Sequence, residues 1–285
     1  MPEHRYRILN VFTAGGDRLS GNPLCVFEDG RPFSDPTMQA LARQLNLSET
    51  TFVLPAASGG TARVRIFTPS FEMPFAGHPT LGTAHVVRDL LAAGDRVRLE
   101  MIAGTVDVSA EGDVWRLRAA RAPETRKLEA SGHDIAEALG LTPSALAGEA
   151  LWVDTGAEQL VVPLARASDV RDAKPVAPLL ARHATSQKRG ASMAYVWARE
   201  DDAIVARFFF LSGQSVIEDP ATGSACANLG GWMVATRAPL PLRVDVRQGD
   251  AVKRPSVLHL EVDATEQIFV SGRVVELGRG SFLMD

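Results

Sequence analysis

Short runs that are rich in β-branched residues, or in which hydrophobic and polar residues alternate, recur along the first half of the chain. Alternation with a period of two, bounded by Gly, Pro, Asp or Ser, is typical of half-buried β-strands. We therefore predict strands at residues 6–13, 24–27, 51–55, 62–68, 97–101, 105–110 and 114–118. Two segments carry apolar residues at helical spacing instead, and we predict helices over residues 35–45 and 79–91.

The second half repeats this plan. We predict its central helix over residues 220–235, and strands at 150–154, 160–164, 194–198, 203–211, 242–246 and 257–262, with a last strand pair within 268–277. The polar segment 169–189 contains two prolines and predicts a helix followed by an exposed loop. The charged segment 119–130, interrupted by Pro123, is the predicted linker between the halves.

One short motif occurs once in each half. Residues 79–84 and residues 220–225 both read Pro-x-x-Gly-(Ser or Thr)-Ala, and the copies lie 141 residues apart. Arg65-x-Phe67 likewise returns as Arg207-x-Phe209, 142 residues later. A near-constant offset indicates two halves of one architecture, and two copies are too few for a solenoid.

These patterns together predict an α+β fold. We expect two pseudo-symmetric lobes, each with a sheet wrapped around a central helix. The predicted lobes span residues 1–122 and 123–277, and residues 278–285 are expected to pack back on the first lobe. A length of 285 residues suits two domains of ordinary size.

The composition argues against nucleic-acid binding and membrane insertion. The hydrophobic share is 46%, the charged share 22% and the formal net charge −4, and charges of neither sign form blocks. We therefore expect a small-molecule ligand and no nucleic acid. No apolar run reaches the roughly 20 residues of a membrane span, and no apolar stretch follows the charged N-terminus as in a secretory signal. A cytoplasmic location without membrane partners is the expectation.

Cysteines and histidines do not suggest a metal or a disulfide. Cys25 and Cys226 are expected to be two buried thiols in a reducing compartment. His78 and His85 lie seven residues apart, close to one face of a helix, but no third ligand lies nearby. We expect two unrelated histidines and no metal.

The two predicted central helices begin beside residues that suit binding or catalysis. Pro79 follows His78, and Pro220 follows Asp219. Proline is favoured at the first helical position because its missing N–H would be unpaired there anyway. Each N-terminus presents unpaired N–H groups and the positive end of the helix dipole, so the two together would hold a substrate carboxylate.

The residues around these two positions have a functional and a structural interpretation. Gly77 and Gly223 would let a ligand approach the backbone closely. Asp219, however, is also an ordinary N-cap residue, and His78 and Ser224 are also compatible with simple capping or packing. Their placement at matched positions in both halves favours the functional interpretation.

Several ordered segments carry a family resemblance. The chain resembles the PhzF-like phenazine-biosynthesis family in residues 21–23 (GNP), 47–53 (LSETTFV), 65–69 (RIFTP), 72–82 (EMPFAGHPTLG) and 218–225 (EDPATGSA). Its tail agrees, with residues 248–249 (QG), 254–256 (RPS) and 270–274 (VSGRV). The resemblance covers nearly the whole chain.

The resemblance implies the diaminopimelate epimerase fold. In this fold each of two similar lobes is a β-barrel-like mixed sheet wrapped around a central helix, and the active site lies in the cleft between them. The resemblance further implies a cofactor-free isomerase, and homodimerisation. The family's best-known member converts trans-2,3-dihydro-3-hydroxyanthranilate to its keto isomer by moving a proton. We accordingly expect a small carboxylate-bearing substrate.

The resemblance also implies roles for individual residues. Glu49, in the Ser-Glu-Thr motif, is the implied general acid/base. His78 is the implied donor or proton shuttle toward the amino or carboxyl end of the substrate, and Asp219 the acceptor that holds its amine. The implied carboxylate cradle consists of Gly77, Thr222, Gly223 and Ser224.

The position of Glu49 suits acid/base chemistry. A carboxylate that moves a proton between two carbons works best in a dry pocket that lifts its pKa toward neutrality. Glu49 stands just before the apolar residues 52–54, at the entrance to a strand. A surface cap or ion pair is the alternative interpretation. An offset of 143 residues places Ser192 opposite Glu49, so only one half supplies this carboxylate.

Two other functions remain open. Related epimerases and racemases use two opposed cysteines, but here Cys226 lies about one turn into the second helix and Cys25 lies in a strand. A two-thiol racemase is therefore disfavoured, while chemistry by Cys226 alone stays open. A binding protein that retained the fold and lost the chemistry is the third hypothesis, and the intact set of Glu49, His78 and Asp219 weighs against it.

Overall fold

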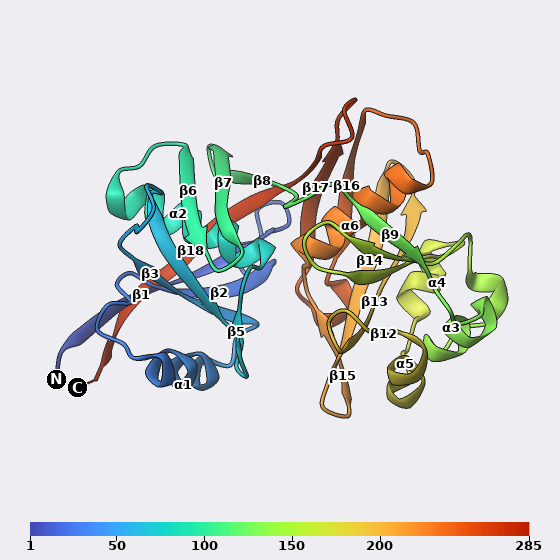
Figure 1. Ribbon diagram of the computed structural model, residues 1–285, viewed down its shortest axis with the longest axis horizontal. Helices are drawn as coiled ribbons and strands as arrows, with labels where there is room; N and C mark the ends of the chain where they lie inside the picture. Colours follow the sequence, from blue (N-terminus) through green and yellow to red (C-terminus); the bar gives the residue numbers. More distant parts are fainter. Residues whose placement is uncertain (285) are drawn as a thin grey trace. The chain divides into compact units, whose positions relative to one another are not determined.

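The contacts of the chain divide it into two compact units. The computed structural model describes residues 1–284. Unit 1 consists of Met1–Arg118 with Ser271–Asp285, and unit 2 of Ala119–Val270. The boundaries between the units therefore lie after residues 118 and 270, whereas the boundaries predicted from the sequence were 122 and 277. Strands and helices are both present in each unit, which confirms the α+β prediction (Figure 1).

Unit 1 is built from nine strands and two helices. Its helices are α1 (Asp35–Leu45) and α2 (Gly77–Leu91). Its strands are β1 (Glu3–Val11), β2 (Asn22–Phe27), β3 (Glu49–Leu54), β4 (Ala62–Phe67), β5 (Glu72–Met73), β6 (Arg96–Met101), β7 (Gly104–Glu111), β8 (Val114–Arg118) and the greater part of β18 (Ile268–Leu283).

The strands of unit 1 close into a barrel around α2. Pairing runs β1–β2–β3–β4–β6–β7–β8–β18 and returns to β1, so eight strands form a closed ring. The pairs β2–β3 and β4–β6 are parallel and the others with a known register are antiparallel. Helix α2 packs against β1, β2, β3, β6 and β8, and ten of its 15 residues are buried. The helix forms the centre of this unit's core.

Unit 2 contains four helices and nine further strands. The helices are α3 (Gly132–Ala138), α4 (Ala167–Asp172), α5 (Ala177–His183) and α6 (Gly223–Ala235). The strands are β9 (Glu124–Lys127), β10 (Leu151–Asp154), β11 (Gln159–Pro163), β12 (Thr185–Ser186), β13 (Ala191–Glu200), β14 (Ala203–Ser212), β15 (Ser215–Asp219), β16 (Leu242–Gln248) and β17 (Ser256–Val262).

The strand pairing of unit 2 follows the same scheme as that of unit 1. Its order is β9–β10–β11–β13–β14–β16–β17, with β11–β13 and β14–β16 parallel. The short strand β15 pairs with β14 as β5 pairs with β4. Helix α6 occupies the place of α2 between the short strand and the next long one, and packs against β10, β11 and β17. The internal repeat is therefore present in the strand pairing.

The Arg-x-Phe repeat makes the same contacts in both units. Arg65 forms a two-pronged ion pair with Glu72 and lies over the ring of Phe67, with its guanidinium carbon 5.0 Å from the ring centre. In unit 2 the guanidinium of Arg207 pairs with Glu218 in the same manner and lies 4.6 Å from the ring centre of the phenylalanine two residues on. Each trio ties the short strand to its long neighbour.

The Pro-x-x-Gly motif, in contrast, is not a structural repeat, and this prediction was wrong. Helix α2 begins at Gly77, so Pro79 is its third residue, whereas α6 begins at Gly223 and Pro220 precedes it. The helix starts therefore match at an offset of 146 residues. The reason is the β14–β15 hairpin, in which Phe209 pairs with Glu218, compared with the shorter Phe67 to Glu72 connection in unit 1. The extra four residues change the offset after the Arg-x-Phe repeat.

A second consequence concerns the residue opposite Glu49 in the repeat. In unit 1 Thr50 pairs with Phe67, and in unit 2 Ala194 pairs with Phe209. Glu49 therefore matches Met193 and not Ser192. Neither Met193 nor Ser192 is acidic, so only unit 1 supplies a carboxylate at this position.

Some elements differ from the prediction. The predicted linker 119–130 contains β9, which pairs with β10 and belongs to the sheet of unit 2. Segment 169–189 holds most of α4, all of α5 and β12 rather than one helix and a loop, and α3 was missed. The predicted last strand pair is one strand, β18. These short elements have weak local signals because their partners lie elsewhere in the unit.

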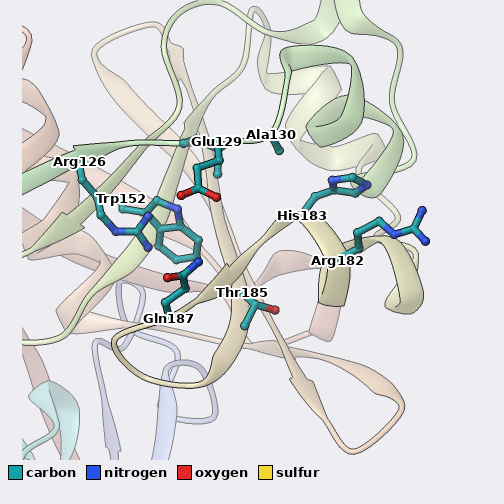
Figure 2. A pocket seen from close by; sticks show the side chains of 9 residues that line it. Arg126, Glu129, Ala130, Trp152, Arg182, His183, Thr185 and Gln187 are labelled. Atoms are coloured by element: carbon teal, nitrogen blue, oxygen red, sulfur yellow. The ribbon is translucent and has the colours of Figure 1, made fainter.

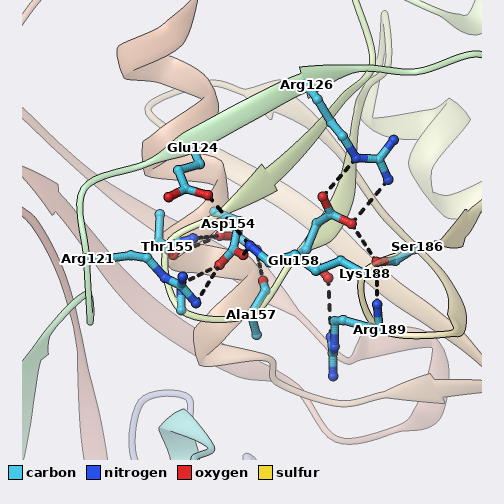
Figure 3. Close-up of polar contacts among 12 residues, drawn as sticks. Arg121, Glu124, Arg126, Asp154, Thr155, Ala157, Glu158, Ser186, Lys188 and Arg189 are labelled. Carbon is cyan, nitrogen blue, oxygen red and sulfur yellow. Dashed lines mark hydrogen bonds and ion pairs between the residues drawn. The ribbon is translucent and has the colours of Figure 1, made fainter. Parts of the chain in front are cut away.

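Ion pairs tie the β9–β10 region of unit 2 to the chain around β12. Asp154 accepts from Lys188 at 2.5 Å and faces Arg121 at 3.3 Å, and these contacts are drawn in Figure 3. Glu158 accepts from Arg126 at 2.9 Å and from the Ser186 hydroxyl at 2.5 Å. Both carboxylates are buried, and each has a cationic partner as buried charges require. In the part of the chain that is described, no helix is both long and apolar enough to cross a membrane.

Candidate functional site

Glu49 and His78 meet inside unit 1. Glu49 is the first residue of β3, which runs parallel to β2 with Leu24 as its partner. His78 is the second residue of α2, the helix enclosed by the barrel. His78 Nε2 lies 3.3 Å from Glu49 Oε2, and the side chains are only 6% and 14% exposed. The structure thus brings together two of the three predicted catalytic residues.

Burial keeps the His78 imidazole neutral. It lowers the pKa of His78 from 6.5 to about 3, although a hydrogen bond from the ring to the Pro23 backbone opposes the shift. Proline has no N–H, so the Pro23 carbonyl is the acceptor and the imidazole the donor. Since Nε2 faces Glu49, the donor is Nδ1–H. A neutral imidazole has only one N–H, and Nε2 therefore presents its lone pair to the carboxyl group.

With Nε2 as an acceptor, this contact becomes a hydrogen bond whenever the Glu49 carboxyl group carries a proton. A lone pair on Nε2 facing a carboxylate oxygen at 3.3 Å is repulsive unless a proton lies between the two atoms. Such a pair can take up and return one proton within an enclosed site.

The N-terminus of α2 is suited to an anion. Its N-cap residue is Ala76, which has no side-chain acceptor, and its first turn contains no acidic residue. The first four residues of the helix, Gly77–Thr80, are all buried. By comparison, α1 and α3 are capped by Ser34 and Ser131, whose side chains accept from first-turn amides. Pro79 at the third position is tolerated because the N–H there has no partner within the helix in any case.

The N-terminus of α6 has the same character. Its N-cap residue is Thr222, which makes no side-chain cap, and its first turn also lacks an acidic residue. Asp219 lies at the end of β15, three residues earlier, and its Oδ2 accepts a hydrogen bond from the Thr222 hydroxyl at 2.5 Å. The interpretation of Asp219 as the N-cap of this helix was therefore wrong.

Gly223 and Ser224 take different positions in α6. Gly223 is the first helical residue and is buried. The Ser224 hydroxyl accepts from Gln159 Nε2 at 3.0 Å, and Gln159 in turn accepts from the buried Asn228 at 2.7 Å. The Ser224 side chain is thus part of a structural network, and its backbone N–H is the group that fits a ligand cradle.

Gln248, at the end of β16, is a polar residue that sequence reasoning did not include in the site. It is 1% exposed, and its side chain contacts the backbone of Asp219 and both the backbone and hydroxyl of Thr222. The only signal in the sequence was the Gln-Gly pair in the family-like tail. Its contacts join β16 to a loop 26 to 29 residues earlier, which local patterns do not reveal.

The cysteines are not placed for catalysis. Both are fully buried and free. Burial raises the pKa of Cys25 to about 12 and raises that of Cys226 further. A thiol with so high a pKa is a poor nucleophile or base at neutral pH. Among residues 1–284, no group of three His, Cys, Asp or Glu side chains is arranged to hold a metal ion.

Two surface cavities lie away from these residues. One, of about 420 Å³ in unit 2, is formed by the chain after β9, by Trp152 and by the end of α5 with the residues that follow it (Figure 2). The other, of about 440 Å³ in unit 1, lies beside the buried Arg7 and its carboxylate partners. Neither contains a predicted site residue. The candidate residues are therefore described by their side-chain geometry within each unit, Glu49 with His78 in unit 1 and Asp219 with Thr222 in unit 2.

Comparisons with known proteins find relatives along almost the whole chain. The family model described as phenazine biosynthesis-like protein matches residues 9–280. An uncharacterized isomerase of Pasteurella multocida is 35% identical over 282 residues, covering 99% of this chain and 94% of the relative. Trans-2,3-dihydro-3-hydroxyanthranilate isomerase of Pseudomonas chlororaphis is 32% identical over 293 residues, covering 99% of this chain and 100% of the relative.

A solved structure shares the fold. The PhzF-family phenazine biosynthesis protein of Bacillus anthracis matches with a TM-score of 0.85 at 22% identity, and the match covers 100% of both chains. At this identity the similarity concerns the fold alone.

Proposed function

Because this chain belongs to the phenazine biosynthesis-like family and is an isomerase, we propose that it moves a proton on a small carboxylate-bearing substrate without a cofactor. The reaction would resemble that of trans-2,3-dihydro-3-hydroxyanthranilate isomerase, the name of one relative. The observation that carries the proposal is the enclosed pair of Glu49 and His78.

Glu49 is the general acid/base of the proposed reaction. Its carboxylate removes a proton from one carbon of the substrate, and the electron pair of that C–H bond moves into the conjugated system. The resulting carboxylic acid returns the proton to a second carbon, so the substrate is isomerised and Glu49 is regenerated. No atom is gained or lost in this sequence.

His78 holds the proton-bearing form of Glu49 in place. Nδ1–H is committed to the Pro23 carbonyl, so Nε2 accepts from the protonated carboxyl group. Burial disfavours the imidazolium, and the proton therefore stays on Glu49 between the two steps. His78 is in this proposal an acceptor that orients the acid.

The helix N-termini supply the binding groups of the proposal. The backbone N–H groups of Gly77, Gly223 and Ser224 bind the substrate carboxylate, and the absence of acidic residues and side-chain caps in both first turns supports this role. Asp219, oriented by Thr222, accepts from the substrate amine.

Proton NMR in deuterated buffer with trans-2,3-dihydro-3-hydroxyanthranilate tests the function. Wild type is expected to isomerise this compound with deuterium appearing at the carbon that receives the proton. Glu49→Gln keeps the shape of the side chain but cannot accept the proton, and is expected to lose about 10²- to 10⁴-fold in rate. Glu111→Gln, on the exposed surface of β7, is the matched control and should retain the wild-type rate.

Two results would contradict the proposal in different ways. A Glu49→Gln variant with the wild-type rate would show that another group moves the proton. A folded wild type that neither isomerises the compound nor exchanges its carbon-bound protons would reject this substrate. Other small amino and hydroxy acids would then be tested with the same pair of variants.

A further inference from the structure

The side chain of Gln248 connects β16 to the loop that carries Asp219. Its Nε2 donates to the Asp219 carbonyl at 2.8 Å and to the Thr222 hydroxyl oxygen at 3.1 Å. Its Oε1 accepts from the Thr222 backbone N–H at 3.3 Å. Gln248 is 1% exposed, so all three bonds lie inside the protein. A single amide therefore determines the positions of both residues.

These bonds give the hydrogen-bond chain one direction. The Thr222 hydroxyl has one proton, and because Gln248 Nε2 donates to its oxygen, that proton points away from the amide. It is directed to Asp219 Oδ2, which lies 2.5 Å from the hydroxyl oxygen. The amide thus fixes both the rotamer and the donor role of Thr222, and through Thr222 the orientation of the Asp219 carboxylate.

The adjacent backbone is shaped to bring Gln248 to this loop. Gly249 has φ +88°, and a Cβ there would lie 2.5 Å from the Pro220 carbonyl oxygen and 2.2 Å from that of Arg254. Only glycine permits this approach. The end of β16 is consequently held against the loop between Asp219 and Thr222.

Unit 1 shows that the fold does not need a glutamine here. At the matching turn of unit 1, between β6 and β7, the backbone N–H of Ala103 donates to the Pro74 carbonyl at 3.1 Å. There a backbone bond joins the turn to the loop, and the turn residues Ile102 and Ala103 have no polar side chain. The polar side chain in unit 2 therefore serves the residues it contacts, Asp219 and Thr222, more than the architecture.

We propose that Gln248 is a positioning residue of the isomerase, which orients the Asp219 carboxylate toward the substrate amine through the Thr222 hydroxyl. The inference rests on the proposed function, because it takes Asp219 to be a substrate-binding residue. Gln248 itself does not touch the substrate.

The kinetic test compares Gln248→Met with Asp219→Asn and the double variant, on trans-2,3-dihydro-3-hydroxyanthranilate. Gln248→Met is expected to lower kcat/KM about 10- to 100-fold, the range for losing one hydrogen bond to a charged group, because it releases the Thr222 hydroxyl from the Asp219 carboxylate. In the Asp219→Asn background the same substitution should change kcat/KM less than about twofold, since its effect passes through Asp219. Gln214→Met, in the exposed β14–β15 turn, is the control expected to match wild type.

Two further measurements separate positioning from folding. Gln248→Glu keeps the side-chain shape and the acceptor for the Thr222 N–H but cannot donate to the Asp219 carbonyl, and it should reproduce the kinetic loss if Gln248→Met does not fold. Amide hydrogen exchange decides the structural part without a substrate. Exchange at Thr222 is expected to accelerate in Gln248→Met, while the amide of Cys226, bonded to the Thr222 carbonyl inside α6, should remain unchanged.

Distinct results overturn the inference and the function. Additive effects of Gln248→Met and Asp219→Asn, or unchanged exchange at Thr222, would overturn the positioning role. Full activity of Asp219→Asn beside an inactive Glu49→Gln would overturn it as well and leave the isomerase proposal intact. Full activity of Glu49→Gln would instead contradict the proposed function.

Discussion

The neutral state of His78 has a measurable consequence for stability. Its pKa is lowered by burial to about 3 in the folded protein, compared with 6.5 for an exposed imidazole. Between these two values the unfolded chain binds a proton at this residue and the folded chain does not. Stability therefore rises with pH wherever the unfolded state binds more protons, and it must fall as the pH drops from 6.5 toward 3.

The size of the effect follows from the shift. One pKa unit corresponds to about 1.4 kcal/mol, so this residue should cost the folded state about 2 kcal/mol at pH 5 relative to pH 7.5. Such a loss is large beside a typical unfolding free energy of about 5–15 kcal/mol. His85, whose pKa is also lowered mainly by burial, contributes in the same direction. A comparison with a variant at His78 isolates the single residue.

Urea unfolding at pH values between 7.5 and 5, followed by far-UV circular dichroism, measures this difference. His78→Gln removes the titrating group. The variant should be less stable than wild type at pH 7.5, because the hydrogen bond to the Pro23 carbonyl and the packing of the imidazole ring are lost. Its free energy of unfolding should nevertheless fall less steeply on acidification. His133→Gln, on the solvent-exposed start of α3, controls for the loss of any histidine. Equal slopes in wild type and His78→Gln would refute the reasoning. A wild type that gains stability at low pH relative to the variant would show that His78 forms a true ion pair with Glu49.

Three other predictions follow from the packing. Native protein at pH 8 should resist iodoacetamide at both cysteines and keep its activity, since burial raises both thiol pKa values; mass spectrometry showing rapid labelling would contradict this. Arg207→Ala should cost about 3–5 kcal/mol in urea unfolding, more than Arg65→Ala, because Arg207 also donates to three backbone carbonyls; equal losses would count against it. Gly94→Ala should lower the free energy of unfolding by about 1–2 kcal/mol, because alanine disfavours the positive φ of this residue. Gly140→Ala should lower it further, because a Cβ at Gly140 would also lie 2.5 Å from the Lys174 carbonyl oxygen. Equal thermal midpoints of the two variants would disprove the clash.

Elements with a strong local pattern were predicted closely. The helix at residues 35–45 and the strand at 114–118 match α1 and β8 to the residue. The α1 boundary has a local cause, since Ser34 caps its first turn and Pro36 suits that turn. Such signals lie within a few residues of the element they define.

The repeat shows where local pattern fails. The Arg-x-Phe copies correspond in the structure because both make an ion pair with the next short strand. The Pro-x-x-Gly copies look equally similar but occupy different places relative to the helix starts. Hairpin length decided the correspondence, and hairpin length depends on strand pairing rather than on the motif itself.

In the candidate site, too, local motifs predicted some residues, whereas the contacts between them became visible only in the structure. Glu49, His78 and Asp219 were selectable because their motifs resemble a family, but no spacing in the chain indicates that the first two lie 3.3 Å apart. Gln248 was not predicted as a site residue, because each of its side-chain hydrogen bonds joins it to a residue 26 to 29 positions away in the sequence.

The amino-acid sequence by itself determined the α+β class, the internal repeat, most of the strands and central helices, and the family. These follow from periodicity and from residues whose chemistry is read locally. Only the tertiary structure decided the start of each central helix, the register of the repeat, the neutral state of His78 and the contacts of Gln248. Each of these depends on burial or on hydrogen bonds between distant segments, and both exist only after the chain has folded.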